Sequence, residues 1–261
     1  MRWLIDTAAQ TVSGLNTSGD LDISYPLSSP EGLDVVAQLY QNSGWHLKAS
    51  YGFSWLGTPI VQLPEDMVRL QEAIVSVKPN VIIETGVSRG GSILFYASLC
   101  HLLALEGQAC RVIGVDHNIW PETREHLESH PLYSYITLID GDSKSPEVVL
   151  KVSECLTEED ACLVTLDSAH DKAHVLEELT VYAPFVSVGS YIVVQDGLMK
   201  HVTEGPRSQP DWDWNNPENA AHEFLEANPN FVHQEPERVF TQSRVKRYPT
   251  QWPFGWLKRI Q

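Results

Sequence analysis

The stretch N-V-I-I-E-T-G-V-S-R-G-G-S-I-L-F-Y-A-S, from Asn80 to Ser98, decides the fold of this chain. It begins with a short apolar run, Val81 to Ile83, of the length and β-branched content of a buried parallel strand. An acid and several glycines follow, and after Gly91 the apolar residues recur at helical spacing. A strand, a glycine loop and a helix in this order are typical of a nucleotide-binding βα unit.

The spacing inside the glycine loop narrows the choice of ligand. Glu84, Gly86 and the pair Gly90-Gly91 match neither the dinucleotide fingerprint G-x-G-x-x-G nor the P-loop, which requires G-K-[ST]. An acid beside the loop suits a cationic ligand better than a pyrophosphate. S-adenosylmethionine carries a sulfonium and an ammonium group, so Glu84 has a natural role in binding it. The alternative is a turn whose glycines only relieve packing.

Further apolar runs follow, separated by helical patterns. The five expected strands cover residues 81–84, 111–116, 136–140, 161–167 and 191–196. Such alternation predicts an α/β fold with a mostly parallel sheet and helices on both faces. The tail from 231 to 244 has strand-like pieces and could supply an antiparallel hairpin at one edge.

All five expected strands end on an acid, and ligands bind at the carboxyl ends of such strands. These acids are Glu84, Asp116, Asp140, Asp167 and Asp196. Asp116 follows the second strand, where a carboxylate can hold both hydroxyls of a ribose; alternatively it is a loop or helix-capping acid. Asp142 and Ser143 follow the third strand, where an adenine amino group could be read, although Gly-Asp-Ser is also ordinary turn chemistry.

The N-terminal part has a different composition. Residues 1–30 are rich in Ser, Thr, Gly and Asp, which predicts an irregular arm. Helical spacing follows in 31–41, and Pro64-Glu65-Asp66 opens another helix. The aromatic stretch between them could be a lid, an oligomer contact or a packed loop. We therefore expect an N-terminal helical and lid extension over 1–64 and a sheet domain over 65–261.

Composition argues against several functions. The 261-residue chain carries a formal net charge of -16, which disfavours a nucleic-acid interface and docking on anionic lipid. No apolar run approaches the roughly 20 residues of a membrane span, and no signal peptide is visible. The four cysteines form no C-x-x-C pair. They are expected to be free thiols in a reducing, cytoplasmic compartment.

Five motifs together resemble the cephalosporin hydroxylase family, which includes rhamnosyl O-methyltransferases. They are V-I-I-E-T-G-V-S-R-G-G-S (81–92), G-V-D-H-N-I (114–119), I-D-G-D-S (139–143), L-D-S-A-H-D-K-A-H-V-L-E-E-L (166–179) and Y-A-P-F-V-S-V-G-S-Y-I-V-V-Q-D-G (182–197). The similarity covers most of residues 40–261. It implies a Rossmann-like class I S-adenosylmethionine-dependent methyltransferase fold with a seven-stranded sheet. It also implies O-methylation of a sugar or polyketide-like natural product. We further expect a small-molecule acceptor and a homo-oligomer.

The resemblance also assigns residues to the cofactor. It implies that Glu84, Gly86 and Gly91 hold the methionine part, that Asp116 holds the ribose, and that the Asp142-Ser143 pair reads the adenine. The full expected cofactor set is Glu84, Gly86, Ser88, Gly91, Ser92, Asp116, His117, Asp142, Ser143 and Asp167.

A divalent metal, usually magnesium, is implied at Asp167 and at the residues that end strand five, Gln195 and Asp196. Relatives can carry an acid where this chain has Gln195. A glutamine oxygen can still ligate a hard cation, but it carries no charge, so a lower metal affinity is expected.

Methyl transfer to a hydroxyl requires an in-line approach and loss of the hydroxyl proton. A cation at Asp167 and Asp196 would lower the hydroxyl pKa and orient the acceptor. His170, just beyond strand four, is the candidate base; alternatively it packs on the following helix. The segment Trp212-Asp213-Trp214 lies among polar and turn-forming residues, and we predict that it closes over the acceptor.

Two rival functions remain open. His170 and His174 are four residues apart and could form an iron triad with Asp167, as in a metal-dependent hydroxylase. Such triads usually lie on a β-sandwich, whereas this chain is predicted to be α/β. The other rival is a catalytically inactive nucleotide-fold subunit that binds a partner, which only Gln195 favours.

Overall fold

A seven-stranded sheet forms the centre of the computed structural model, which describes residues 2–245 and 247–261. The strand order is β11-β12-β10-β9-β6-β7-β8. The bounds are β6 Val81–Thr85, β7 Arg111–Asp116, β8 Ile136–Asp140, β9 Cys162–Leu166, β10 Tyr191–Val194, β11 Phe231–His233 and β12 Trp256–Arg259. Strands β6 to β10 pair in parallel, and β12 runs antiparallel between β10 and β11. The mostly parallel seven-stranded sheet is therefore confirmed.

The antiparallel edge differs from the expectation in one respect. Strand β11 lies inside the predicted 231–244 segment, but its partner β12 comes from the end of the chain. Phe231 pairs with Arg259, and the described residues from 234 to 255 form neither helix nor strand. The hairpin is thus closed by a long connection that returns across the sheet domain.

Helices cover both faces of the sheet because its strand residues alternate between two layers. Ile82, Val112 and Leu163 pack with helices α2 (Pro64–Val77), α3 (Gly91–Leu105) and α4 (Pro121–Ser129). Ile83, Ile113 and Val164 pack with α5 (Pro146–Glu154), α6 (Lys172–Tyr182) and α7 (Pro217–Ala227). Each such buried side chain contributes roughly 1.5–3 kcal/mol. With both faces covered, the strand ends are left to bind ligands.

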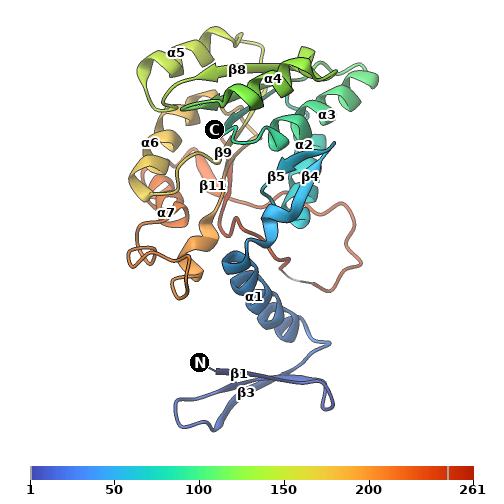
Figure 1. The fold of residues 1–261 in the computed structure, drawn as a ribbon, viewed down its shortest axis with the longest axis vertical. Coiled ribbons are helices and arrows are strands. Elements are labelled where there is room, and N and C mark those ends of the chain that lie inside the picture. Colours follow the sequence, from blue (N-terminus) through green and yellow to red (C-terminus); the bar gives the residue numbers. More distant parts are fainter. Residues whose placement is uncertain (1, 246) are drawn as a thin grey trace.

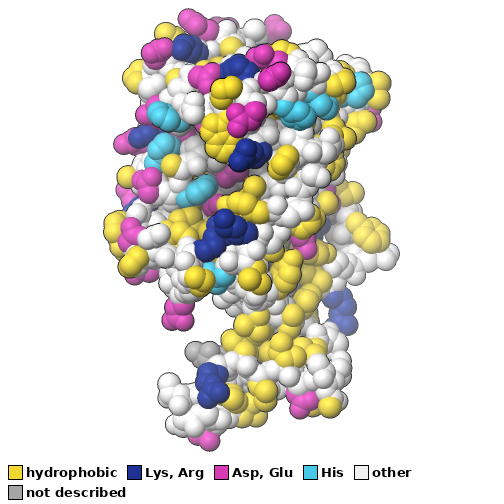
Figure 2. Space-filling view, in the orientation of Figure 1, with side chains coloured by type: hydrophobic (Ala, Val, Ile, Leu, Met, Phe, Trp, Pro, Cys, Tyr) yellow, Lys and Arg dark blue, Asp and Glu magenta, His cyan; other side chains and the backbone are white. Residues whose placement is uncertain are grey.

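Residues 2–26 are not irregular, which corrects the expectation from composition. Strands β1 (Arg2–Asp6), β2 (Thr11–Leu15) and β3 (Leu21–Pro26) form an antiparallel sheet. These strands are stabilised by pairing with one another and by contact of β2 and β3 with helix α1 (Pro30–Leu47). Figure 1 shows this small sheet projecting from the sheet domain at the far end of α1. In Figure 2, hydrophobic side chains gather where α1 meets the small sheet.

Short elements complete the chain. They are η1 (Ala49–Gly52), β4 (Phe53–Trp55), β5 (Thr58–Ile60), η2 (Tyr133–Tyr135), η3 (Ala183–Phe185) and η4 (Gly197–His201). The β4–β5 hairpin packs on α3. In the aromatic stretch before α2, Trp45 and Ile60 are buried, whereas Tyr51 and Phe53 are exposed. Among the described helices, none combines the length and the apolar character needed to cross a bilayer.

Candidate active site

A cleft of about 400 Å³ opens at the carboxyl ends of β6, β7, β8 and β9. Seven of the ten predicted cofactor residues line it: Gly86, Ser88, Asp116, His117, Asp142, Ser143 and Asp167. The structure thus brings together residues from four separate loops. We refer to this space as the strand-end cleft.

Asp116 holds the glycine loop in shape at the edge of this cleft. Its Oδ2 accepts hydrogen bonds from the backbone N–H groups of Val87, at 2.8 Å, and Ser88, at 3.0 Å. Its Oδ1 accepts from the N–H of Asn118 at 3.0 Å. The carboxylate therefore couples the loop after β6 to the loop after β7, in addition to facing the cleft.

The other three predicted cofactor residues lie behind the glycine loop. Glu84 is fully buried, and its Oε2 accepts from the Ser92 hydroxyl at 2.6 Å. Burial raises the pKa of Glu84 to about 8, although the Ser92 hydrogen bond opposes the shift. Its Oε1 has no hydrogen-bond partner among the described residues. Gly91 lies against β5, where a Cβ atom would be 2.2 Å from the carbonyl oxygen of Pro59.

Gly86 joins the strand-end cleft to the loop after β9. Its φ of +98° lies in the left-handed region, which a glycine adopts without strain. A Cβ atom here would lie 2.0 Å from the carbonyl oxygen of Asp167. The glycine is therefore required by contact between two protein loops.

A polar cluster on the wall opposite the glycine loop joins the predicted Ser143 and His174 to two residues that the sequence analysis did not identify, Ser168 and Glu178. Glu178, fully buried on α6, accepts at Oε1 from the hydroxyls of Ser143 and, at 2.7 Å, Ser168. The Nε2 of His174 lies 3.0 Å from the Ser168 hydroxyl and 3.4 Å from Glu178 Oε1. Ser143, Ser168 and His174 all line the cleft. The sequence signal was that Glu178 shares the buried face of α6 with three apolar or aromatic residues, Val175, Leu179 and Tyr182.

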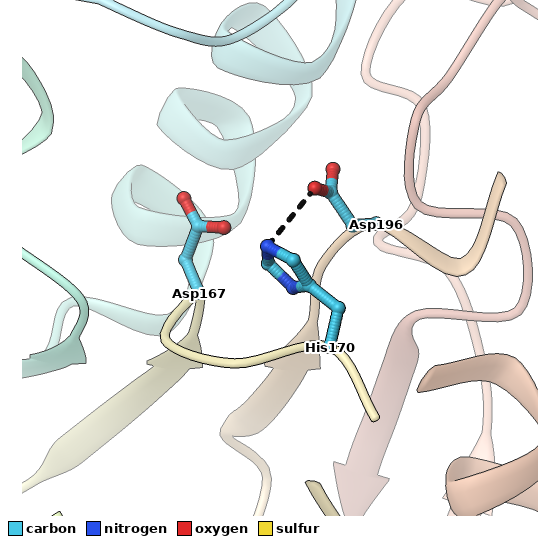
Figure 3. Close-up of side chains that lie close together, drawn as sticks. All are labelled: Asp167, His170 and Asp196. Carbon is cyan, nitrogen blue, oxygen red and sulfur yellow. Dashed lines mark ion pairs between the residues drawn. The ribbon is translucent and has the colours of Figure 1, made fainter. Parts of the chain in front are cut away.

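Asp167, His170 and Asp196 come together beside the strand-end cleft, and we call them the acidic corner. One ligand atom from each lies within 4.8 Å of the others. His170 Nε2 is 3.3 Å from Asp196 Oδ2, and Figure 3 shows the three side chains pointing toward one another. Asp167 belongs to both the cleft and the corner. The predicted convergence of strands four and five is therefore present.

Both acids of the corner have pKa values above the ordinary range. Desolvation raises the pKa of Asp167 well above its usual value, and the charges of Asp196, Glu84 and Glu178 add to this. Desolvation also raises the pKa of Asp196, and the neighbouring His170 and Arg207 oppose this shift. Two carboxylates that are costly to ionise together favour a cation between them.

Gln195 and His174, which the magnesium and iron hypotheses respectively place at the ion, each have a hydrogen-bond partner in the protein. Gln195 Oε1 accepts a hydrogen bond from Gln62 Nε2 at 3.2 Å, so its carbonyl oxygen already has a partner within the protein. The alternative iron triad is not assembled, because His174 contacts Ser168 and Glu178 while Asp196 takes the third place beside His170.

The donor atoms present fit both implied groups. The carboxylates of Asp116, Asp142 and Asp167 line the cleft, and Glu84 Oε1 has no hydrogen-bond partner behind the glycine loop; together they suit a cationic ligand with ribose hydroxyls. In the corner, carboxylate oxygens and an imidazole suit a divalent cation such as Mg²⁺ or Mn²⁺. Asp167 and Asp196 would hold that ion.

The Trp212–Trp214 segment is only partly available as a lid. Trp212 packs edge-on against Trp45 of α1, with ring centroids 5.7 Å apart, whereas Trp214 is 59% exposed. Asn215 Oδ1 accepts from the N–H of Lys172 at 2.8 Å. The loop therefore lies next to the segment that carries His170, and the exposed Trp214 is the side chain free to move.

Known proteins resemble this chain in sequence. The family model described as Rhamnosyl O-methyltransferase/CmcI matches residues 47–260. A rhamnosyl O-methyltransferase of Mycobacterium leprae (strain TN) is 28% identical over 145 residues, which are 55% of this chain and 59% of that protein. A rhamnosyl O-methyltransferase of Mycobacterium tuberculosis (strain ATCC 25618 / H37Rv) is 25% identical over 62% of this chain and 64% of its own length. The match spans less than two thirds of either relative.

Solved structures resemble the fold. A CmcI structure with Mg and SAM superposes with a TM-score of 0.51 and 20% identity, covering 81% of this chain and 78% of that chain. The apo structure of CmcI gives the same TM-score with 19% identity, covering 81% and 77%. This likeness, together with the strand order, shows the class I methyltransferase fold.

Proposed function

The chain belongs to the Rhamnosyl O-methyltransferase/CmcI family, and we propose that it transfers a methyl group from S-adenosylmethionine to a hydroxyl of a sugar or polyketide-like natural product, with Mg²⁺ or another divalent cation. The relatives' rhamnosyl substrates and the cofactors of the CmcI structure support this assignment.

One observation carries the proposal: Asp167 lines the strand-end cleft and also belongs to the acidic corner. A methyl donor in the cleft and an acceptor at the corner would therefore meet at one residue. In-line transfer requires this proximity, because holding two reactants in a near-attack geometry removes much of the entropic barrier.

The chain's own residues have separate tasks in this reaction. Acids around the cleft, among them Glu84 and Asp116, bind the ammonium group and ribose of the donor. His170 takes the acceptor proton, and Asp196 Oδ2, 3.3 Å from its Nε2, is placed to stabilise the imidazolium that forms. The S–CH₃ bond breaks as the O–CH₃ bond forms, and S-adenosylhomocysteine leaves.

A divalent ion bound at Asp167 and Asp196 supplies a Lewis acid that lowers the hydroxyl pKa. Gln195, next to Asp196 in the chain, is buried and uncharged, and it is hydrogen-bonded to the buried Gln62. We keep Gln195 as a candidate third ligand, because its side-chain oxygen accepts one hydrogen bond and has a second lone pair for a hard cation.

The test is an acceptor screen read by mass spectrometry. The protein is incubated with S-adenosylmethionine and Mg²⁺ against rhamnosides, nucleotide sugars and polyhydroxylated polyketides. We expect a mass gain of one methyl group on one class, and loss of this product in excess chelator. Calorimetry with S-adenosylhomocysteine and NAD is the binding control. Binding of NAD with no binding of either S-adenosyl compound would overturn the proposal.

We also propose a homo-oligomer and a cytoplasmic location. The small N-terminal sheet and α1 expose the apolar side chains Leu4, Ile5, Leu21, Leu33, Tyr40 and Leu47, which a second copy of the chain could cover. The four free cysteines suit a reducing compartment. Sedimentation of the full chain, compared with a Leu21→Glu variant, tests the assembly; a monomeric wild type contradicts it.

A further inference from the structure

We propose that Asp66, a buried carboxylate of helix α2, is a positioning residue that sets Asp196 in the acidic corner by holding the C-terminal segment 250–255 against it. The inference rests on the proposed function, since it concerns the metal site of that reaction.

Asp66 uses both of its oxygens on neighbouring residues of the tail. Oδ1 accepts from the hydroxyl of Thr250, and Oδ2 accepts from the N–H of Gln251 at 2.8 Å. The Thr250 hydroxyl in turn accepts from the N–H of Trp252 at 2.9 Å. Asp66 is 3% exposed, so the three hydrogen bonds are shielded from water and fix the backbone conformation of the tail.

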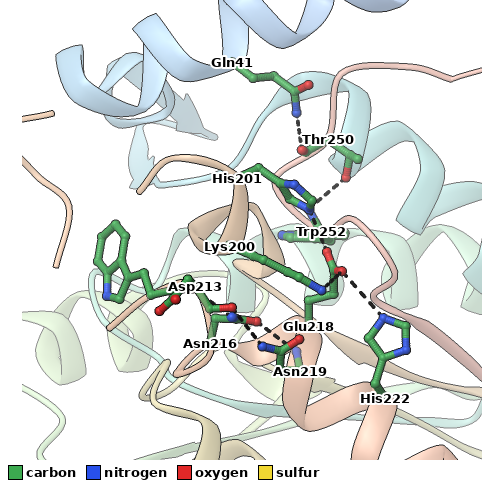
Figure 4. A network of polar contacts seen from close by, with 11 residues as sticks. Gln41, Lys200, His201, Asp213, Asn216, Glu218, Asn219, His222, Thr250 and Trp252 are labelled. Carbon is green, nitrogen blue, oxygen red and sulfur yellow. Dashed lines mark hydrogen bonds and ion pairs between the residues drawn. The ribbon is translucent and has the colours of Figure 1, made fainter. Parts of the chain in front are cut away.

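The N-terminal extension holds the same tail residues from the other side. Figure 4 shows Gln41 of α1 reaching the backbone of Thr250, whose oxygen accepts from the Gln41 amide. Gln251 Nε2 donates to the Ser50 hydroxyl of η1 at 3.1 Å. The tail is therefore clamped between α2 and the segment 41–50.

The clamped tail brackets the backbone that carries Asp196. The carbonyl oxygen of Gln251 accepts from the N–H of Leu198 at 3.0 Å, and that of Gly255 accepts from the N–H of Val194 at 2.8 Å. Between them, a Cβ atom at Gly197 would lie 2.7 Å from the carbonyl oxygen of Pro253. The tail thus contacts the chain immediately before and after Asp196.

Asp196 needs such support because its backbone is strained. Its φ of 56° is left-handed, a conformation that costs a non-glycine residue energy and persists only when the surroundings impose it. Burial raises the pKa of Asp66 to about 7, and the charge of Asp196 contributes to the shift. The two carboxylates are therefore within electrostatic reach as well as mechanically linked.

The competing explanation is that Asp66 only attaches the tail to α2 and stabilises the fold. The two roles differ in what happens to metal affinity when the fold is retained. Residues that orient a metal ligand typically change affinity by 10–100-fold when replaced, whereas a remote structural attachment leaves the affinity of the folded protein unchanged.

The experiment compares Asp66→Asn with Glu65→Gln, which removes a charge from the same helical turn without touching the tail. Mn²⁺ alone is titrated calorimetrically into the full-length protein, and S-adenosylhomocysteine is titrated separately. We expect Asp66→Asn to weaken Mn²⁺ binding by about tenfold or more with S-adenosylhomocysteine affinity within about twofold, because the amide has a single acceptor oxygen where the carboxylate has two, one for each of the donors Thr250 and Gln251. Glu65→Gln should match the wild type in both.

Thr250→Val and Thr250→Ser provide a second pair in case Asp66→Asn does not fold. The valine variant should weaken Mn²⁺ binding, and the serine variant, which keeps the hydroxyl, should restore it. Wild-type Mn²⁺ affinity in folded Asp66→Asn or Thr250→Val overturns the inference and leaves the proposed function intact. A wild type that binds S-adenosylhomocysteine but no Mn²⁺ overturns the metal assignment itself, and the inference with it.

Discussion

The strand-end cleft and the acidic corner are built in different ways. In the cleft, side chains are fixed by nearby loops: Asp142 accepts from the N–H of Lys144 two residues later, and Asp116 holds the loop of the adjacent parallel strand. In the corner, Asp196 is bracketed by the segment 250–255, which Asp66 holds from α2. The cleft therefore depends on contacts among the loops that line it, and the corner depends in addition on a segment from the end of the chain, so mutations in that segment should separate the two.

The largest separation is expected from Asp196→Asn. Loss of one carboxylate should weaken the metal site and lower kcat by at least about a hundredfold, since charge stabilisation by a metal ion is worth several kcal/mol. Binding of S-adenosylhomocysteine, measured by calorimetry, should stay within about twofold. Asp213→Asn, an exposed acid of the nearby loop, is the matched control. Full activity of Asp196→Asn in excess chelator would contradict a metal role.

Asp116→Ala should give the reverse pattern. It removes a carboxylate that holds the glycine loop through two backbone N–H groups. Charge-assisted hydrogen bonds are worth about 1.5–3 kcal/mol each, so the Kd of S-adenosylhomocysteine should rise about 10–100-fold. The Mn²⁺ affinity of Asp116→Ala should be unchanged. The control variant, Glu125→Gln on α4, should bind both S-adenosylhomocysteine and Mn²⁺ like the wild type. A variant that lost Mn²⁺ binding equally would remove the distinction between the two regions.

The two buried acids, Glu84 behind the cleft and Asp66 beside the tail that supports the corner, should each make the free energy of unfolding depend on pH. Burial raises their pKa values in the fold to about 8 and about 7, from ordinary values of 4.5 and 3.8. Between these limits the unfolded chain is ionised and the folded one protonated, so unfolding releases a proton. The free energy of unfolding should therefore fall as pH rises, by about 1.4 kcal/mol per pH unit for each group.

Urea unfolding of the ligand-free protein between pH 5 and pH 8 measures these slopes. Glu84→Gln should remove the contribution of one proton to the slope of unfolding free energy against pH, up to about pH 8. Asp66→Asn should remove the same contribution only up to about pH 7. Identical curves for both variants and the wild type would show that neither acid is protonated in the fold.

The smallest effect is expected at the exposed loop beside the corner. Trp214→Ala should raise the acceptor KM about two- to tenfold, the range of a lost aromatic contact of 0.5–1.5 kcal/mol, with cofactor binding unchanged. Trp212→Ala should instead lower thermal stability, because Trp212 packs on Trp45. Unchanged acceptor kinetics in Trp214→Ala would defeat the lid prediction.

The sequence predicts the parts of the structure whose determinants are contiguous. The five parallel strands lie within three residues of their expected bounds, because each is a buried apolar run followed by an acid. Strand β12 and the strands of the small N-terminal sheet were missed, since their positions depend on cross-strand partners. Gln195 illustrates the same limit within the site: its partner Gln62 lies 133 positions earlier.

The contact between Gly86 and the carbonyl oxygen of Asp167 has a consequence for how this protein can vary. With no room there for even one methyl group, any side chain at position 86 displaces both loops at once. In a saturation library, position 86 should be intolerant under selection for donor binding and equally under selection for metal loading. A substitution at position 86 therefore cannot change the preference for the methyl donor without also changing the preference for the metal. Changes in one preference alone must come from residues at the periphery of the two loops.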